Sequence, residues 1–327
     1  MKIKYRKIAV FTSGGDAPGM NAAIRGVVRT AHNFGTEVYG VYHGYEGLID
    51  NEMRLLESKD VSGIIHRGGT FLYSARSKRF MTEEGREEAY KNLRNRGIEA
   101  LVAIGGDGTF TGASVFNKEY NFPVIGIPGT IDNDIYGSDL TVGYDTALNT
   151  VVEAIDKIKD TAGSHNRLFF IEVMGRDAGF IALNAGIATG AEDILIPETV
   201  TYMDDLIITL KENKRKGKTS AIIIVAEGDD AGGAYDVAAK VKALDNSYST
   251  RVSVLGHMQR GGSPSAVDRV LASTLGYESV VALIKGYERH MVGIMNNEVV
   301  YTPLEKAIKT PHEINKNKLR IARVLSI

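Results

Sequence analysis

Strand-like apolar runs alternate with helical patterns along the whole of this chain, and this order constrains the fold most. Residues 8–11 read as a buried strand, and the apolar residues after Gly19 recur at helical spacing until Gly35. Further strands are predicted at 100–104, 123–127, 168–173, 194–196, 222–225 and 252–255, and further helices at 83–96, 178–189, 203–215 and 234–244. Such alternation predicts βαβ units with mostly parallel strands. The length of 327 residues suggests two such sheets with a cleft between them.

A clear amphipathic helix is predicted to follow Asp145, which is a suitable N-cap residue. Its apolar face consists of Leu148, Val151, Val152, Ile155 and Ile158. We expect this helix to have a structural role.

Composition excludes several classes of function. The 39 Lys and Arg residues nearly balance 40 Asp and Glu residues, so the chain has no global basic field for nucleic acid or an anionic membrane. The absence of cysteine excludes thiol nucleophiles, redox pairs and cysteine-bound metals. We find no signal peptide and no apolar stretch near the roughly 18 residues of a membrane span, so a cytoplasmic location is expected.

Glycine is unusually frequent, and two strand ends lead into glycine-rich loops. There are 36 glycines in 327 residues, about 11%, against a usual level of roughly 7%. Loops 14–19 and 105–109 offer backbone N–H groups to a phosphate where a strand meets a helix, although tight turns alone would also explain them. Asp107 is the residue type that holds Mg²⁺ beside a nucleotide. Residues 217–219 read GKT, but they precede a strand, so a P-loop is rejected.

Carboxylates and arginines indicate phosphoryl transfer. Asp132 and Asp134 follow a buried strand beside Thr130, and Asp132 suits the acceptance of a hydroxyl proton, unless the pair only forms an Asx turn. Arginine matches phosphate oxygens geometrically. The arginines beside strand runs or glycine turns are Arg76, Arg167, Arg176, Arg251 and Arg260, each of which could instead form a surface ion pair.

With these residues in hand, the chain resembles the bacterial ATP-dependent 6-phosphofructokinases along nearly its whole length. The motifs occur in that family's order and spacing: TSGGDAPGMNAAIRGVVR (12–29), RGGTFLYSAR (67–76), IGGDGT (104–109), PGTIDND (128–134), EVMGR (172–176) and LGHMQRGGSP (255–264). The resemblance implies an α/β fold of two three-layer α/β/α domains with mostly parallel sheets. The implied ATP-binding domain comprises residues 1–142 plus about 258–308, and the sugar-phosphate-binding domain 143–257 plus about 309–327.

The implied reaction is the glycolytic transfer of the γ-phosphoryl group of MgATP to the 1-hydroxyl of fructose 6-phosphate. By position, the ATP side is implied to be Gly15, Arg76, Ser77, Gly106, Asp107, Gly108 and Thr109. Asp107 is implied to bind Mg²⁺. Asp132 is implied as the general base, with Thr130 and Arg76 stabilising the transferred group.

The resemblance also implies the residues that hold fructose 6-phosphate. They are Thr130, Asp132, Met174, Gly175, Arg176, Glu227, His257 and Arg260. Arg167 and Arg251 are implied to reach this substrate from a neighbouring subunit, because the family forms homotetramers with shared sites. Pyrophosphate-using relatives bear Asp at position 108 and Lys at 129, so Gly108 and Gly129 favour ATP by leaving room for it.

The family's effector site, which takes ADP or phosphoenolpyruvate, is only partly matched. The implied effector residues are Arg25, Arg29, Lys159, Gly190, Glu192, Lys216 and Lys218. Gly63, Lys159 and Thr219 depart from the usual Asp, Arg and Lys, so we expect weak or altered sensitivity to effectors.

Two rival functions remain to be weighed. A lipid or NAD kinase would share IGGDGT, but PGTIDND has no place there. A non-catalytic nucleotide sensor would be expected to lack Asp107 or Asp132, and both are present.

Overall fold

The computed structural model describes residues 4–163, 167–218 and 220–325. The chain divides into two compact units: unit 1 is Met1–Ile131, Ile135–Thr146 and Arg260–His312, and unit 2 is Asp132–Asp134, Ala147–Gln259 and Glu313–Ile327. Each is an α/β unit, as the sequence predicts. Among the described residues, no helix is both long and apolar enough to cross a membrane.

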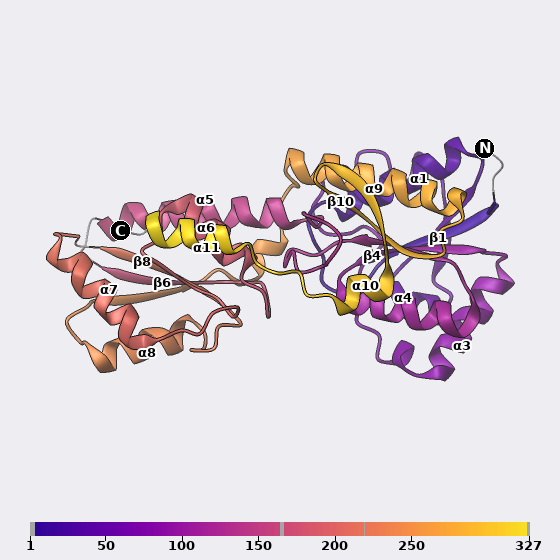
Figure 1. Cartoon of the computed structure of the whole chain (residues 1–327). Helices are drawn as coiled ribbons and strands as arrows, with labels where there is room; N and C mark the ends of the chain where they lie inside the picture. The colour runs from indigo at the N-terminus through magenta and orange to yellow at the C-terminus, as the bar shows by residue number, and fades with distance from the viewer. Residues whose placement is uncertain (1–3, 164–166, 219, 326–327) are drawn as a thin grey trace. The chain divides into compact units, whose positions relative to one another are not determined.

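Unit 1 is built on a seven-stranded sheet in the order β11-β10-β5-β4-β1-β2-β3. The strands are β1 (Lys7–Thr12), β2 (Glu37–Val41), β3 (Met53–Leu56), β4 (Ala100–Gly105), β5 (Val124–Pro128), β10 (Arg289–Met295) and β11 (Glu298–Pro303). The helices are α1 (Met20–Asn33), α2 (Gly44–Ile49), α3 (Glu83–Asn95), α4 (Asp107–Tyr120), α9 (Ala266–Lys285) and α10 (Leu304–Lys309). Figure 1 shows α1 and α9 on one face of this sheet and α3, α4 and α10 on the other.

Unit 2 has a four-stranded, fully parallel sheet in the order β7-β8-β6-β9. Its strands are β6 (Leu168–Val173), β7 (Asp193–Leu195), β8 (Ala221–Ala226) and β9 (Thr250–Val254). Its helices are α5 (Tyr144–Gly163), whose first three residues belong to unit 1, α6 (Phe180–Thr189), α7 (Met203–Arg215), α8 (Ala234–Leu244) and α11 (Lys316–Leu325). Helices α5, α6 and α11 lie on one face, and α7 and α8 on the other (Figure 1).

The predicted elements agree with the structure to within two residues, with one correction at the start of α5. That helix begins at Tyr144, so the prediction that Asp145 caps it is wrong. Asp145 lies in the first turn, where its carboxylate accepts a hydrogen bond of 2.5 Å from Ser265 Oγ. The antiparallel pairs β2–β3 and β10–β11 had no counterpart in the predicted pattern.

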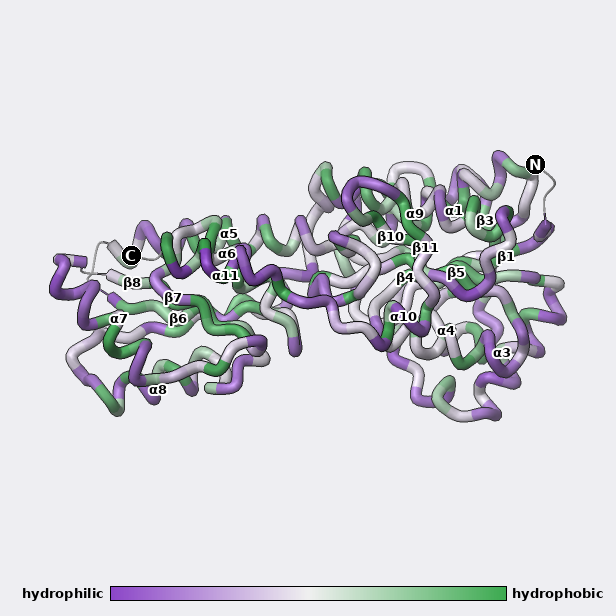
Figure 2. The backbone as a smooth tube through the Cα atoms, in the orientation of Figure 1, coloured by the Kyte–Doolittle hydropathy of each residue, from purple (hydrophilic) through white to green (hydrophobic). Residues whose placement is uncertain are grey.

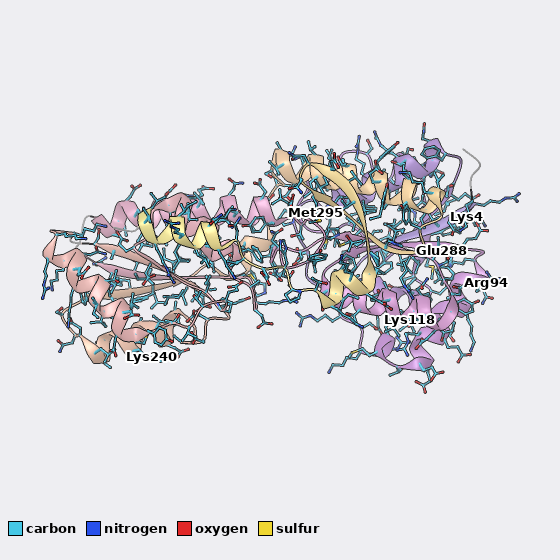
Figure 3. The ribbon with its side chains drawn as sticks, in the orientation of Figure 1. Lys4, Arg94, Lys118, Lys240, Glu288 and Met295 are labelled. Carbon is cyan, nitrogen blue, oxygen red and sulfur yellow. The ribbon has the colours of Figure 1, made fainter. Side chains whose placement is uncertain are left out.

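Burial follows the apolar patterns that defined the elements. In unit 1, Phe11, Phe110 and Phe116 are fully buried between sheet and helices, and in unit 2 Phe170 and Ile223 are their counterparts. Figure 2 shows hydrophobic colour along the strands of both sheets. Charged groups pair at the surface, as where Lys4 Nζ lies 2.7 Å from Glu288 (Figure 3).

Helices α1 and α9 touch backbone to backbone. A Cβ atom at Gly26 would lie 2.9 Å from the carbonyl oxygen of Ser273, and one at Gly276 would lie 2.5 Å from that of Ala23. Glycine at both positions therefore permits this close crossing.

The order of strands in unit 1 fixes where a ligand crevice can form. From β1 the chain passes through α1 to β2 on one side, and from β4 it passes through α4 to β5 on the other. Strands β1 and β4 are parallel neighbours, so the direction of winding changes between their carboxyl ends. In open α/β sheets, ligands bind at such a switch point.

Candidate active site

The glycine loops after β1 and β4 are joined to each other at this switch point. Ser13 N donates to the carbonyl oxygen of Ile104 at 3.0 Å, and Thr109 Oγ1 donates to that of Ser13 at 3.1 Å. A Cβ atom at Gly105 would lie 2.3 Å from Thr109 Oγ1 and 2.5 Å from the Ser13 oxygen. Position 105 thus requires glycine, and Thr109 is a buried link between the loops.

Helix α4 begins directly at this switch point. Its first residues, Asp107 and Gly108, are exposed, and a Cβ atom at Gly108 would meet nothing within 4 Å. The N-terminus of a helix attracts phosphate through its N–H groups and dipole. Mg²⁺ is usually bound by one or two carboxylates together with substrate phosphates, so Asp107 fits a Mg²⁺–nucleotide complex. Within the described residues, no group of three or more acidic or histidine side chains could hold a metal by itself.

A third segment, residues 128–130 at the end of β5, joins the two glycine loops at the switch point. Gly129 N donates to the carbonyl oxygen of Gly105 at 3.0 Å, and a Cβ atom at Gly106 would lie 3.6 Å from that of Thr130. A Cβ atom at Gly129 would lie 3.0 Å from Ile104 Cγ2. Close packing is therefore a reason for glycine at 129, whereas open space is found at Gly108.

Arg260 lies with the first glycine loop rather than with the other predicted sugar-phosphate residues of unit 2. Its guanidinium packs against Gly15, where Nη1 would lie 2.5 Å from an added Cβ atom, and it donates to the carbonyl oxygen of Asp16 at 3.2 Å. A cation thus stands beside the loop that the sequence assigns to phosphate.

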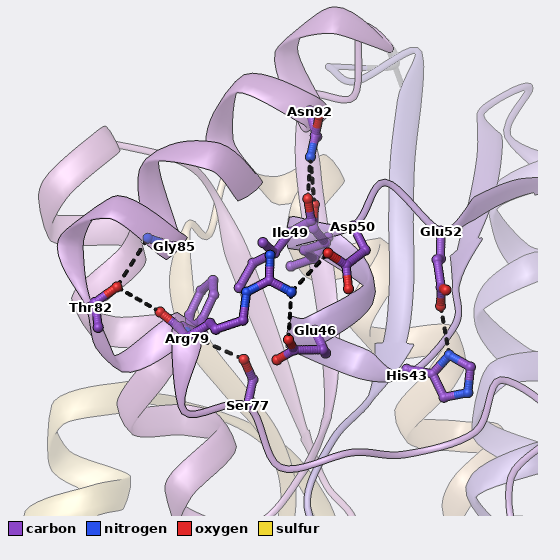
Figure 4. Close-up of polar contacts among 12 residues, drawn as sticks. His43, Glu46, Ile49, Asp50, Glu52, Ser77, Arg79, Thr82, Gly85 and Asn92 are labelled. Atoms are coloured by element: carbon purple, nitrogen blue, oxygen red, sulfur yellow. Dashed lines mark hydrogen bonds and ion pairs between the residues drawn. The ribbon is translucent and has the colours of Figure 1, made fainter.

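The segment that carries Arg76 is fastened on both sides. Upstream, Ser74 Oγ donates to the carbonyl oxygen of Gly14 at 2.5 Å. Downstream, Arg79 Nη1 contacts Glu46 of α2 at 2.7 Å and Asp50, the C-cap residue of that helix, at 2.8 Å (Figure 4). The Arg76 side chain is itself exposed, so it is available to a ligand.

Ser77 performs a local task in the same segment. Its Oγ accepts a hydrogen bond of 3.1 Å from Phe80 N (Figure 4). This bond forms the turn that leads to the Arg79 anchor.

In unit 2, Glu227 organises the loop after β6. Its Oε1 accepts hydrogen bonds from Arg176 N at 2.7 Å and from Gly175 N at 3.2 Å. Gly175 has a φ of 149° and Arg176 a φ of 53°, so both depart from ordinary strand geometry. Met174 N donates to Gln259 Oε1 at 3.2 Å. The predicted residues Met174, Gly175, Arg176 and Glu227 are thus together.

The predicted base is buried and faces a cation. The Asp132 side chain is 2% exposed, and its Oδ2 lies 3.5 Å from Nε of Arg176, which is 51% exposed. The contact brings two of the predicted site residues, Asp132 and Arg176, together.

Arg167 and Arg251 lie at the amino-terminal ends of strands β6 and β9, whereas Arg176 follows the carboxyl end of β6. Arg167 directly precedes β6, and Arg251 is paired with Phe169 near the start of β9. A six-residue strand spans about 20 Å at roughly 3.3 Å per residue. Within one chain, these arginines are not brought together with Arg176.

Gln259 is a site residue to which the sequence reasoning gave no role. It is fully buried, and its Nε2 donates to the carbonyl oxygen of Gly256 at 3.0 Å while its Oε1 holds Met174. The only signal for it was its place between His257 and Arg260 in the LGHMQRGGSP motif. His257 itself is exposed on the short 3₁₀ helix Gly256–Arg260.

Some of the predicted effector residues gather in unit 2. Lys159 Nζ donates to the carbonyl oxygens of Thr189 and Gly190. Glu192 Oε2 accepts a hydrogen bond of 2.6 Å from Ile222 N. Both groups therefore already serve the fold of the unit.

The other predicted effector residues are divided between the two units. Lys216 lines a cavity of about 550 Å³ together with Glu192, and Lys218 lies three residues after the end of α7. Arg25 and Arg29 lie on α1 in unit 1, where burial and then the neighbouring Arg29 lower the pKa of Arg25. Gly63 is exposed with open space around it, and Thr219 lies outside the described residues.

Comparison with known proteins identifies the family of the chain. The phosphofructokinase family model matches residues 7–283. ATP-dependent 6-phosphofructokinase 1 of Thermus thermophilus is 55% identical over 98% of this chain and 100% of its own. ATP-dependent 6-phosphofructokinase 2 of Bacteroides thetaiotaomicron is 53% identical over 98% of both chains. The structure of phosphofructokinase from Saccharomyces cerevisiae superposes with a TM-score of 0.89 at 38% identity, covering 98% of this chain and 48% of that one. This chain belongs to the phosphofructokinase family.

Proposed function

We propose that this protein is an ATP-dependent 6-phosphofructokinase, which transfers the γ-phosphoryl group of ATP to the 1-hydroxyl of fructose 6-phosphate in glycolysis. The products are fructose 1,6-bisphosphate and ADP. The observation that carries the proposal is the switch point of the unit 1 sheet, where Asp107 lies at the start of α4 among three hydrogen-bonded loops. A cytoplasmic location follows from the glycolytic role.

The nucleotide is held by unit 1 in this proposal. The loops supply Gly15, Gly106, Gly108 and Thr109, and the anchored segment supplies Arg76 and Ser77. Asp107 binds Mg²⁺, which when present neutralises charge on the nucleotide phosphates. The open space at Gly108 supports ATP as the donor, because a carboxylate there would repel its phosphates.

Asp132 accepts the proton of the attacking hydroxyl, and Thr130 and Arg76 stabilise the phosphoryl group in transit. The Arg176 guanidinium lies 3.5 Å from Asp132, and this contact between two predicted site residues supports the proposal. Met174, Gly175, Arg176, Glu227, His257 and Arg260 bind the sugar phosphate, with Glu227 fixing the loop of the first three.

The active site is completed in a homotetramer by Arg167 and Arg251 of a neighbouring subunit. Both arginines lie at the amino-terminal ends of their strands, a strand length away from the Arg176 loop, so they cannot contact a ligand of that loop in their own chain. This position supports the proposal. The test is complementation. Arg251→Ala and Asp132→Asn subunits, each inactive alone, should regain activity when dissociated and reassembled together. Failure of hybrids to recover activity would contradict shared sites.

An effector such as ADP or phosphoenolpyruvate is proposed to bind near Lys159, Gly190, Glu192, Lys216 and Lys218, with Arg25 and Arg29 from a neighbouring subunit. Lys159 and Glu192 already form hydrogen bonds with backbone groups, which supports a weak response of the activity to effectors.

The deciding experiment is a steady-state assay of purified protein with ATP, Mg²⁺ and fructose 6-phosphate. We expect formation of ADP and fructose 1,6-bisphosphate. Asp132→Asn should lower kcat by about 10²–10⁴-fold, the usual contribution of a general base, with little change in KM. Lack of turnover in the wild type would reject the function, and an unchanged kcat in Asp132→Asn would reject only the base.

A further inference from the structure

Asp268 is a fully buried carboxylate in the first turn of α9. Its Oδ1 accepts a hydrogen bond from Gly143 N at 2.8 Å. Its Oδ2 accepts from Thr146 N at 2.8 Å and from Thr146 Oγ1 at 2.5 Å. A buried carboxylate is tolerated only when such donors surround it. Asp268 thus binds both ends of the segment 143–146.

The N-termini of α5 and α9 meet here, and each donates hydrogen bonds to side chains of the other. Ser265, the N-cap of α9, donates from its N to Thr146 Oγ1 at 2.9 Å and from its Oγ to Asp145 Oδ2 at 2.5 Å. Ser265 Oγ also accepts from Asp268 N at 3.2 Å. Each helix N-terminus carries partial positive charge, so Asp145 and Asp268 offset the repulsion between α5 and α9.

The segment that Asp268 holds leads directly to the third loop of the candidate site. Val142 N donates to the carbonyl oxygen of Pro128 at 2.8 Å, and Val142 pairs with Gly129. Thr141 Oγ1 donates to the carbonyl oxygen of Thr130 at 2.6 Å. Residues 141–146 are therefore fixed by Asp268 at one end and support the backbone of Thr130 at the other.

The same segment also packs against the first glycine loop. A Cβ atom at Gly19 would lie 2.8 Å from Val142 Cγ1 and 3.6 Å from Asp268 Cβ. A Cβ atom at Gly143 would lie 2.6 Å from that of Ala17. Two of the three loops of the crevice thus rest on residues 142–143.

We propose that Asp268 is a positioning residue for phosphoryl transfer. It holds residues 141–146, and through them it sets the place of Thr130 and of the glycine loop, without touching either substrate. This inference rests on the proposed function. Displacement of catalytic groups by about 1 Å can cost about 10²-fold in rate, so the effect belongs in kcat.

The test compares kcat, KM and melting temperature of the full-length protein and its variants. Asp268→Asn keeps the shape but loses the charge and replaces one of the two acceptor oxygens with a donor, and we expect kcat to fall about 10–100-fold while KM for both substrates changes less. The matched control is Leu283→Ala, a buried position at the other end of α9, which should lower the melting temperature and leave kcat unchanged well below it.

Substitutions of Thr146 test the same hydrogen bond from its other partner, with a smaller change than the loss of the Asp268 carboxylate. Thr146→Val removes the hydroxyl and should lower kcat, whereas Thr146→Ser retains it and should restore kcat to near the wild-type value. In the double variant Asp268→Asn/Thr146→Val, the losses should not add, because both remove one network. These variants decide the matter if Asp268→Asn does not fold.

A stable Asp268→Asn or Thr146→Val protein with wild-type kcat would overturn the inference, even if its melting temperature fell. Equal kcat for Thr146→Val and Thr146→Ser would overturn it as well. An inactive wild type would instead overturn the proposed function, and the inference with it, so the two failures are distinguishable.

Discussion

The hydroxyl of Thr109 donates a hydrogen bond of 3.1 Å to the carbonyl oxygen of Ser13, which joins the first turn of α4 to the loop after β1. Replacing Thr109 by Val leaves that carbonyl without its donor, at a cost of about 1–3 kcal/mol. We expect a lower melting temperature and a KM for ATP raised about tenfold, as about 1.4 kcal/mol corresponds to tenfold in affinity. Thr109→Ser keeps the donor and should behave as the wild type. Equal KM values for both variants would contradict this role.

Gly108 should control the choice of phosphoryl donor. A carboxylate about 4 Å from a phosphate charge is repelled by up to about 4 kcal/mol near a protein surface. Gly108→Asp should therefore lower kcat/KM for ATP by up to about a thousandfold, without loss of stability because no atom lies within 4 Å of the added Cβ. Steady-state kinetics with ATP and with pyrophosphate measure this. Gly108→Ala is the control for size, and an equal loss there would show that charge is not the cause.

Glu227 should act on fructose 6-phosphate through the loop it holds. Its carboxylate accepts two backbone hydrogen bonds, and bonds to charged groups are worth about 1.5–3 kcal/mol. We expect KM for fructose 6-phosphate to rise in the order wild type, Glu227→Gln, Glu227→Ala, since Gln retains one neutral acceptor. Titration of the sugar at saturating ATP gives the values. A KM for ATP that rises in parallel would argue against a role confined to the sugar.

His290 should make the protein less stable in mild acid. Burial, with a smaller effect from Arg289, lowers the pKa of His290, whose Nδ1 is buried and has no hydrogen-bond partner. The unfolded chain therefore takes up the proton first as pH falls below about 6.5, and the free energy of unfolding decreases. His290→Phe keeps an aromatic ring beside Tyr287 and should reduce this decrease. Urea unfolding at pH 7.5 and 5.5 tests it, and identical pH dependence in both proteins would refute it.

Most of the fold could be predicted because local patterns determine it. The run of apolar residues that forms β4 and the glycines after it specify strand, turn and helix start without reference to the rest of the chain. The antiparallel strands β10 and β11 were missed, although only Asn296 and Asn297, both at positive φ, separate them in a local hairpin. Only the pairing of β10 with β5 depends on a neighbour distant in sequence. The start of α5 was misplaced by two residues, and a partner distant in sequence, Asp268, binds its N-terminus.

The candidate site could be predicted in its residue types but not in its supports. Motifs pointed to Asp107, Asp132 and Arg176, whose side chains carry recognisable chemistry. Gln259 and Asp268 act on backbone groups of segments remote in sequence, and no spacing rule reveals such contacts. The role of Gly129 likewise needed coordinates, because its neighbour Ile104 belongs to another strand.

The contact of Gly26 on α1 with α9 has a consequence for how this family member can change. Side-chain cores adapt to substitution by repacking, but the distance between these two helices is set by main-chain atoms. Helix α1 starts at the first glycine loop, and Asp268 lies in the first turn of α9, so the crossing of the two helices sets a fixed distance between these two features. The surrounding apolar residues can be substituted as long as they repack, whereas a side chain at position 26 or 276 requires the two helices to move apart.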